Sequence, residues 1–184
     1  MTRWFEDIVI GETYPLGSHT FTEAEIIRFG KLYDPQYFHV DPEAAKSGPF
    51  GGLVASGWHT VAVGHRHMVD ALDAEAERIR EAGGEPGVAG PSPGVNKADF
   101  RVPVRPGDSL TYDFIVKDKR ASNSLPGWGV LISIIEGVNQ RGEQAYRAEI
   151  VSFTKLRDYR MALHLKALMA LARVPGLRAL LPGR

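Results

Sequence analysis

The sequence predicts a single α+β domain in which one long helix packs on an antiparallel β-sheet. Two observations predict this class. A long run of apolar residues at helical spacing begins after residue 56, and segments with strand patterns follow it, the last two joined by a turn. A helix followed by strands that tight turns connect favours an antiparallel sheet. At 184 residues the chain is long enough for one domain with a substantial core, and its length does not require a second domain.

Two helix starts can be located from capping residues. Thr22 to Glu25 forms a capping box, which marks the beginning of an early helix. Ser56 precedes the long helix and suits its N-cap, and Gly83-Gly84 ends it. The apolar pattern of this helix consists of Val61, Val63, His67, Met68, Ala71, Leu72, Ala76 and Ile79. We expect the start of the helix to be largely buried.

Three segments after the helix have the composition of strands. Residues 110–117 alternate between apolar and mostly polar side chains, which is typical of a strand with one buried face. Residues 128–135 are almost continuously apolar and β-branched, as expected of a strand covered on both faces. Arg141-Gly142 predicts a hairpin turn that leads into residues 144–155.

The most informative segment lies before the long helix, where Asp34 stands five residues before His39. Pro35 disfavours helical geometry at Asp34, and with Pro42 it predicts a segment that is neither regular helix nor strand. Asp41 is expected to cap a short helix that begins at Pro42. A bend of this kind can direct the carboxylate and the imidazole at one water molecule, where either group can move a proton. The spacing is also common by chance and fits a cap or a surface residue.

The beginning of the long helix offers a second functional group. The first N–H groups of a helix have no partner inside it and carry the positive end of its dipole. The amide of Gly57 can therefore hold a carbonyl oxygen that becomes negative during a reaction. Glycine at this position lets a ligand approach the backbone closely, although ordinary helix-start chemistry explains Gly57 as well.

Three motifs, taken in order, resemble the MaoC-like dehydratases, relatives of the (R)-specific enoyl-CoA hydratases. The motifs are residues 34–42 (Asp-Pro-Gln-Tyr-Phe-His-Val-Asp-Pro), 52–57 (Gly-Leu-Val-Ala-Ser-Gly) and 100–108 (Phe-Arg-Val-Pro-Val-Arg-Pro-Gly-Asp). The third resembles a strand and turn that follow the central helix in that family. The resemblance implies a hotdog fold, in which a curved antiparallel sheet wraps a long central helix. We therefore expect a hotdog domain over residues 1–156 and a C-terminal helical extension over residues 157–184.

The resemblance implies reversible hydration of a 2-enoyl thioester, or dehydration of the matching (R)-3-hydroxyacyl thioester. Asp34 would activate a water molecule as base, while His39 orients the water and takes part in returning a proton to C2. The Gly57 amide would stabilise the enolate oxygen. Coenzyme A or an acyl carrier protein is then the substrate carrier, and no metal or redox cofactor is needed. The family often has Asn and Pro where this chain has Gln36 and Tyr37, which bears on substrate preference.

We expect substrate contacts from Gln36, Ser56, Trp58 and His65. Gln36 offers an amide hydrogen bond. His65 stands two turns beyond Gly57 and would line an acyl tunnel, although a position in the core or an interface fits it equally well. The three histidines at positions 59, 65 and 67 do not project to one face as metal ligands would, so no metal site is expected.

Composition excludes several classes of protein. The 22 Lys and Arg residues balance 22 Asp and Glu residues, so no overall charge attracts nucleic acid. Without cysteine the chain has neither a disulfide nor a thiol nucleophile. The N-terminus lacks the apolar core of a secretory signal, and no apolar run is long enough to span a bilayer, so we expect a cytoplasmic protein. The resemblance implies a homodimer or an assembly of dimers.

Two segments and two other functions stay open. Residues 83–94, with five glycines and three prolines, are either an exposed connector or a mobile flap over the acyl pocket. The tail has an apolar helical stripe that can pack on this domain, on a partner subunit or on a membrane surface: Met161, Leu165, Leu168, Met169 and Ala172. A hotdog thioesterase and a non-catalytic acyl-thioester-binding subunit are the alternative functions.

Overall fold

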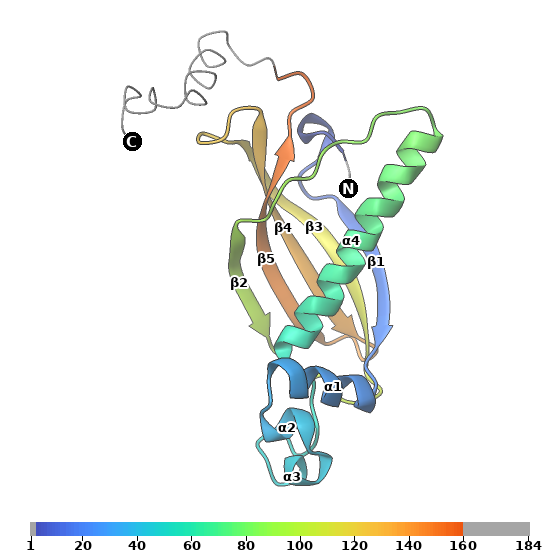
Figure 1. Ribbon diagram of the computed structural model, residues 1–184, viewed down its shortest axis with the longest axis vertical. Helices are drawn as coiled ribbons and strands as arrows, with labels where there is room; N and C mark the ends of the chain where they lie inside the picture. The colour runs from blue at the N-terminus through green and yellow to red at the C-terminus, as the bar shows by residue number, and fades with distance from the viewer. Residues whose placement is uncertain (1–2, 160–184) are drawn as a thin grey trace, which may run out of the picture.

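The computed structural model describes residues 3–159, and in it a curved antiparallel sheet wraps one long helix (Figure 1). The sheet has the order β1-β3-β4-β5-β2. Its strands are β1 (Thr13–Thr20), β2 (Gly94–Phe100), β3 (Ser109–Ala121), β4 (Trp128–Asn139) and β5 (Gln144–Lys155), and the helices are η1 (Phe5–Asp7), α1 (Glu23–Tyr33), α2 (Tyr37–Val40), α3 (Pro42–Lys46) and α4 (Gly57–Glu81). The predicted α+β architecture is confirmed, whereas the helix expected over residues 157–184 lies almost entirely outside the described residues.

The strand patterns place the core between the sheet and α4. Alternate residues of β3 are buried as predicted: Leu110, Tyr112, Phe114 and Val116. Tyr112 also joins the two layers, because its hydroxyl donates a hydrogen bond to the carbonyl of Thr60 in α4 at 3.2 Å. β4 is buried on both faces over most of its length, as its apolar composition predicted. The predicted turn at Arg141-Gly142 joins β4 to β5.

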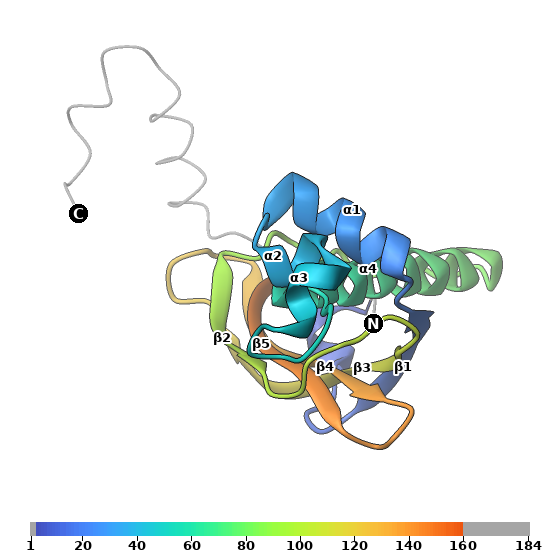
Figure 2. The same cartoon turned by 90° about the horizontal axis from the view of Figure 1, so that it is seen from below.

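Side-chain caps fix where the helices begin. Thr22 accepts a hydrogen bond from the backbone N–H of Glu25 at 3.3 Å, and the Asp41 carboxylate accepts bonds from the amides of Glu43 and Ala44, each at 3.0 Å. Ser56 accepts one from the N–H of Trp58 at 3.2 Å. The three predicted N-caps are therefore confirmed. α1, α2 and α3 lie together near the N-terminal end of α4 (Figure 2).

The segment around Asp34 is more regular than predicted. Residues 37–40 form the single turn of α2, in which the Gln36 carbonyl accepts a bond from the N–H of His39 at 2.8 Å. Pro35 does not prevent this turn, because it lies ahead of it and restricts only the preceding Asp34. Asp34 has a φ of −151° and a ψ of 72° and forms the C-cap of α1. A short helix thus holds His39 close to the end of α1.

One further expectation is corrected by the arrangement around β2. The strand predicted to begin at Phe100 ends there, and residues 101–104 form an irregular segment in which the Val104 carbonyl accepts a bond from the Ala55 amide at 2.8 Å. Residues 83–94 form a mostly exposed connector between α4 and β2, as one of the two interpretations of the sequence expected, and hydrogen bonds attach it to the sheet. The carbonyl of Val88 accepts a bond from the Lys155 amide at 2.9 Å, and the amide of Gly90 donates to Phe153 at 2.7 Å. These bonds fasten the segment to the end of β5.

His59 is a buried histidine that ring contacts hold in place. Its ring stacks on Phe29 with centroids 4.6 Å apart, and it meets the edge of Phe21 at 5.0 Å. Within residues 3–159 its Nδ1 atom has no hydrogen-bond partner. Burial lowers the pKa of His59 to about 4, because the charged imidazolium is poorly solvated there.

We expect His59→Phe to reduce the loss of stability in acid. His59 titrates near 6.5 in the unfolded chain and near 4 in the folded protein, so protonation favours the unfolded chain as the pH falls from 6.5 to 4. This loss is on the order of 2–3 kcal/mol at pH 4.5. Phenylalanine fills the same space between two rings and binds no proton. Denaturant unfolding at pH 7 and pH 4.5 measures the difference.

The control for this prediction is His65→Phe, since His65 is exposed on the same helix. It should keep the wild-type difference in unfolding free energy between the two pH values. A His59→Phe protein that loses as much stability in acid as the wild type would show that another group causes the loss.

Candidate active site

A pocket of about 320 Å³ lies at the N-terminal end of α4. It contains six of the seven residues that the sequence suggested for catalysis or substrate binding: Asp34, Gln36, His39, Ser56, Gly57 and Trp58. An apolar wall faces them, and it includes Phe50, Phe100 and Val102. The fold therefore brings together groups that come from the end of α1, from α2 and from the first turn of α4.

Asp34 is held by two hydrogen bonds. Its Oδ2 atom accepts one from the Ser56 hydroxyl at 2.7 Å, and its Oδ1 atom accepts one from the Gln36 amide at 2.8 Å. Burial raises the pKa of Asp34, but these two hydrogen bonds and the nearby His39 outweigh burial and keep the pKa below its ordinary value. The carboxylate is thus ionised at neutral pH and oriented, as a general base must be.

His39 is 6% exposed, and a hydrogen bond fixes the orientation of its ring. The Nδ1 atom lies 2.7 Å from the carbonyl oxygen of Val54. A carbonyl oxygen only accepts hydrogen bonds, so we assign a proton to Nδ1. The other ring nitrogen, Nε2, lies 3.3 Å from Oδ2 of Asp34. The imidazole nitrogen that can exchange a proton therefore faces the carboxylate.

Gly57 provides an N–H group at the first position of α4. The neighbouring amides have partners, since the N–H of Trp58 donates to the Ser56 hydroxyl and that of His59 donates to the Ser56 carbonyl at 2.9 Å. No acceptor for the Gly57 N–H is found among residues 3–159. The group can therefore donate to a ligand in the pocket, at the end of the helix where the dipole favours negative charge.

His65 is the one expected substrate contact that the structure does not bring to this pocket. It is exposed on α4 and lines a separate pocket of about 300 Å³, together with Met68 on the same helix. Ala89 and Gly90, from the segment after α4, line this second pocket as well.

Two partners of the candidate pair were missed by sequence reasoning. The Val54 carbonyl orients His39, and the Ser56 hydroxyl binds Asp34, although Ser56 was expected as a helix cap. A backbone carbonyl has no signature in the sequence. A serine that precedes a helix signals a cap, and nothing in the sequence signals its contact with a carboxylate 22 residues earlier.

Among residues 3–159, no group of three or more His, Asp or Glu side chains is placed to hold a metal ion. None of the helices in that range combines the length and the hydropathy that crossing a bilayer requires.

The fold and the pocket define a hotdog domain with its candidate site at the start of the central helix. The family model described as "MaoC like domain" matches residues 7–126. This range includes Asp34, His39, Ser56 and Gly57. The chain belongs to the MaoC-like dehydratase family.

Individual relatives agree with this assignment. The chain is 30% identical to the uncharacterized protein YdeM of Bacillus subtilis over 148 residues, which are 79% of this chain and 94% of YdeM. It is also similar to the crystal structure of the MaoC-like dehydratase from Rhodospirillum rubrum, with a TM-score of 0.68 and 30% identity over 84% of this chain and 97% of that one. The (R)-hydratase PhaJ1 of Pseudomonas aeruginosa, 18% identical, shares the fold with a TM-score of 0.58 over 86% of this chain and 91% of PhaJ1.

Proposed function

We propose that this protein catalyses the reversible hydration of a 2-enoyl thioester, or the dehydration of the corresponding (R)-3-hydroxyacyl thioester. One observation carries the proposal: the facing side chains of Asp34 and His39 share a pocket with a helix N-terminal amide for which residues 3–159 offer no acceptor. An ionised carboxylate, an imidazole and an oxyanion donor are the groups that this reaction requires. Membership of a family named for dehydratases supports the same assignment.

In the hydration direction, the water molecule binds between the Asp34 carboxylate and Nε2 of His39. Asp34 takes one proton from the water as its oxygen forms a bond to C3 of the enoyl group. The electron pair of the double bond moves toward the thioester carbonyl, whose oxygen becomes negative and accepts a hydrogen bond from the Gly57 N–H. The proton that Asp34 took from the water is then delivered to C2, with the participation of His39. The two additions occur on the same face because one pair of residues serves both carbons.

The surroundings of the pair suit a thioester substrate. The wall formed by Phe50, Phe100 and Val102 is apolar and fits an acyl chain or the pantetheine arm of coenzyme A or an acyl carrier protein. Trp58, 62% exposed, stands beside Gly57, where it can contact the carrier. Only proton transfers and charge stabilisation are required in these steps, so the proposed reaction needs no redox cofactor or metal.

A panel of 2-enoyl-CoA substrates of increasing chain length tests the proposal. We expect the ultraviolet absorbance of the conjugated enoyl thioester to disappear without release of free thiol. Release of thiol would instead indicate a thioesterase, and binding without turnover across the panel would indicate a non-catalytic acyl-binding subunit. Protein carrying Asp34→Asn, prepared in the same way, controls for contaminating hydratases.

We also propose that two copies of this chain pair through β2. This strand is an edge of the sheet, and its Val95 and Phe100 side chains are 53% and 46% exposed. An open edge with apolar side chains favours pairing with another strand.

Light scattering should report a dimer for the wild type and a monomer for Val95→Lys. Val9→Lys, which changes a residue that is 54% exposed outside the sheet, is the control and should remain dimeric. A dimeric Val95→Lys protein would exclude this interface.

A further inference from the structure

The loop of residues 48–52, called here the Phe50 loop, forms one side of the candidate active site. The ring of Phe50 meets the ring of Phe38 edge to face at 5.2 Å, and Phe38 in turn meets His39 at 4.5 Å. The loop ends in Gly51 and Gly52, whose φ values of 64° and 154° are rare for other residues. The Gly51 amide closes this turn onto the Gly48 carbonyl at 3.1 Å, so a contact from elsewhere in the domain can fix where the turn lies rather than its shape. The position of the turn affects the space beside the imidazole.

Arg105 supplies such a contact from the turn that precedes β3. Its Nη2 atom donates a hydrogen bond to the carbonyl oxygen of Phe50 at 2.6 Å. Its Nη1 atom lies 3.4 Å from the point where a Cβ atom on Gly52 would stand. Within residues 3–159 no other hydrogen bond to the Phe50 carbonyl is found. The guanidinium group thus binds the backbone of Phe50 and lies close to Gly52.

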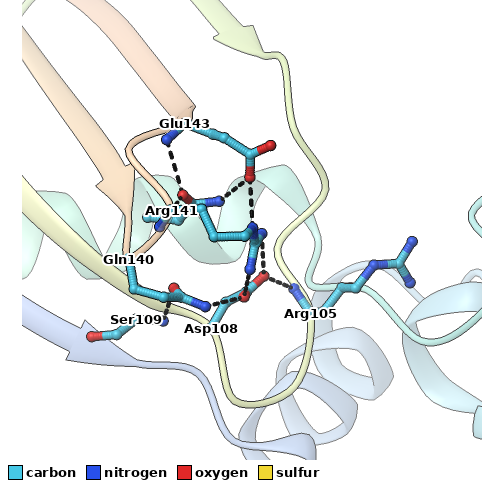
Figure 3. A network of polar contacts seen from close by, with 7 residues as sticks. Arg105, Asp108, Ser109, Gln140, Arg141 and Glu143 are labelled. Atoms are coloured by element: carbon cyan, nitrogen blue, oxygen red, sulfur yellow. Dashed lines mark hydrogen bonds and ion pairs between the residues drawn. The ribbon is translucent and has the colours of Figure 1, made fainter.

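A network of polar contacts centred on Asp108 holds the turn that carries Arg105 (Figure 3). Asp108 is 5% exposed, and its carboxylate accepts hydrogen bonds from the Arg105 amide at 2.9 Å, from Gln140 at 2.7 Å and from Arg141 at 2.7 Å. Burial raises the pKa of Asp108, but these bonds outweigh burial and hold the pKa below its ordinary value. The turn is therefore anchored to the hairpin between β4 and β5, while the side chain of Arg105 reaches out to the loop.

We propose that Arg105 is a positioning residue that latches the Phe50 loop and thereby sets the fit of the thioester substrate beside His39. The inference rests on the proposed function, and it names a specificity determinant outside the pocket. Arg105 does not line the pocket and acts only through Phe50. Without the latch, the aromatic wall loses its fixed position and substrate binding weakens.

A double-mutant cycle tests how Arg105 acts. Arg105→Ala should raise KM by about 3-fold to 10-fold, the size of one aromatic contact, with a smaller change in kcat. Phe50→Ala should raise KM similarly. In the Phe50→Ala background, Arg105→Ala should add no further increase, because both changes remove the same contact. Independent, multiplicative effects would overturn the latch and indicate that Arg105 binds the substrate directly.

Hydrogen exchange tests the latch without relying on activity. Arg105→Ala should accelerate amide exchange in residues 48–53 by about threefold or more, since the loop loses its anchor, while the midpoint of thermal unfolding stays within a few degrees. Arg120→Ala removes the same charge at the far end of β3 and should leave this exchange unchanged. Unchanged exchange in Arg105→Ala would overturn the latch even in an active hydratase. If Arg105→Ala accelerates this exchange while the wild-type protein shows no hydratase turnover, the latch is supported and the proposed reaction is refuted.

Discussion

Asp34→Asn and His39→Gln are each expected to reduce kcat by about 10²-fold to 10⁴-fold, the range for losing a positioned general acid or base. Asparagine keeps the shape of Asp34 and can still accept the hydrogen bond from Ser56, but it cannot take a proton. Glutamine replaces the imidazole, whose ring nitrogen faces the carboxylate, with an amide that does not exchange protons as an acid or base. Steady-state kinetics on an enoyl thioester that the wild type hydrates measure the loss, and circular dichroism confirms the fold.

Asp41→Asn is the matched control for Asp34→Asn. It makes the same chemical change seven residues along the chain, at a residue that caps α3 and does not line the pocket. Asparagine is also a good N-cap, so we expect an unchanged fold and a kcat within about twofold of the wild type. The double variant of Asp34 and His39 should be little slower than the worse single variant, because both act on one water molecule. Near-normal turnover in both single variants would mean that the assigned site is wrong.

The parts of the fold that could be predicted are those with a complete local pattern. Apolar spacing identified α4 and the alternating burial of β3, and capping residues marked three helix starts. β1 has no comparable signal. Pro15 and Gly17 interrupt its pattern, and within residues 3–159 it pairs with β3 alone, through a ladder whose register shifts between these two residues. Such an edge strand is defined by its partner, which the local sequence does not contain.

The candidate site could also be predicted only in part. The motifs identified which residues meet, and six of seven lie in one pocket. The contacts that orient them could not be predicted, because the Val54 carbonyl meets His39, and the Ser56 hydroxyl meets Asp34, only in the folded chain. His65 is separated from Gly57 by geometry: eight residues of helix extend about 12 Å, which is too far for one pocket at the start of α4.

Gly57→Pro is expected to reduce kcat by about 10²-fold to 10³-fold, the loss seen when one oxyanion donor is removed. Proline eliminates the N–H group and is tolerated in the first turn of a helix. Ser56 has a ψ of 140°, the extended conformation that a residue before proline adopts, so the backbone already suits the change. Gly57→Ala retains the N–H group and serves as the comparison.

The side chain of Phe100 affects both Gly57 variants. A Cβ atom on Gly57 would lie 2.8 Å from ring atoms of Phe100, so alanine and proline crowd the same side chain. Phe100 is 46% exposed on the edge strand β2, and its truncation to alanine removes the clash without emptying the core. In the Phe100→Ala background, kcat of the Gly57→Pro variant should therefore be about 10²-fold to 10³-fold lower than kcat of the Gly57→Ala variant. Both variants carry the added Cβ atom, and only the proline variant lacks the N–H group. Equal turnover in the two folded double variants would show that the Gly57 amide does not hold the thioester oxygen.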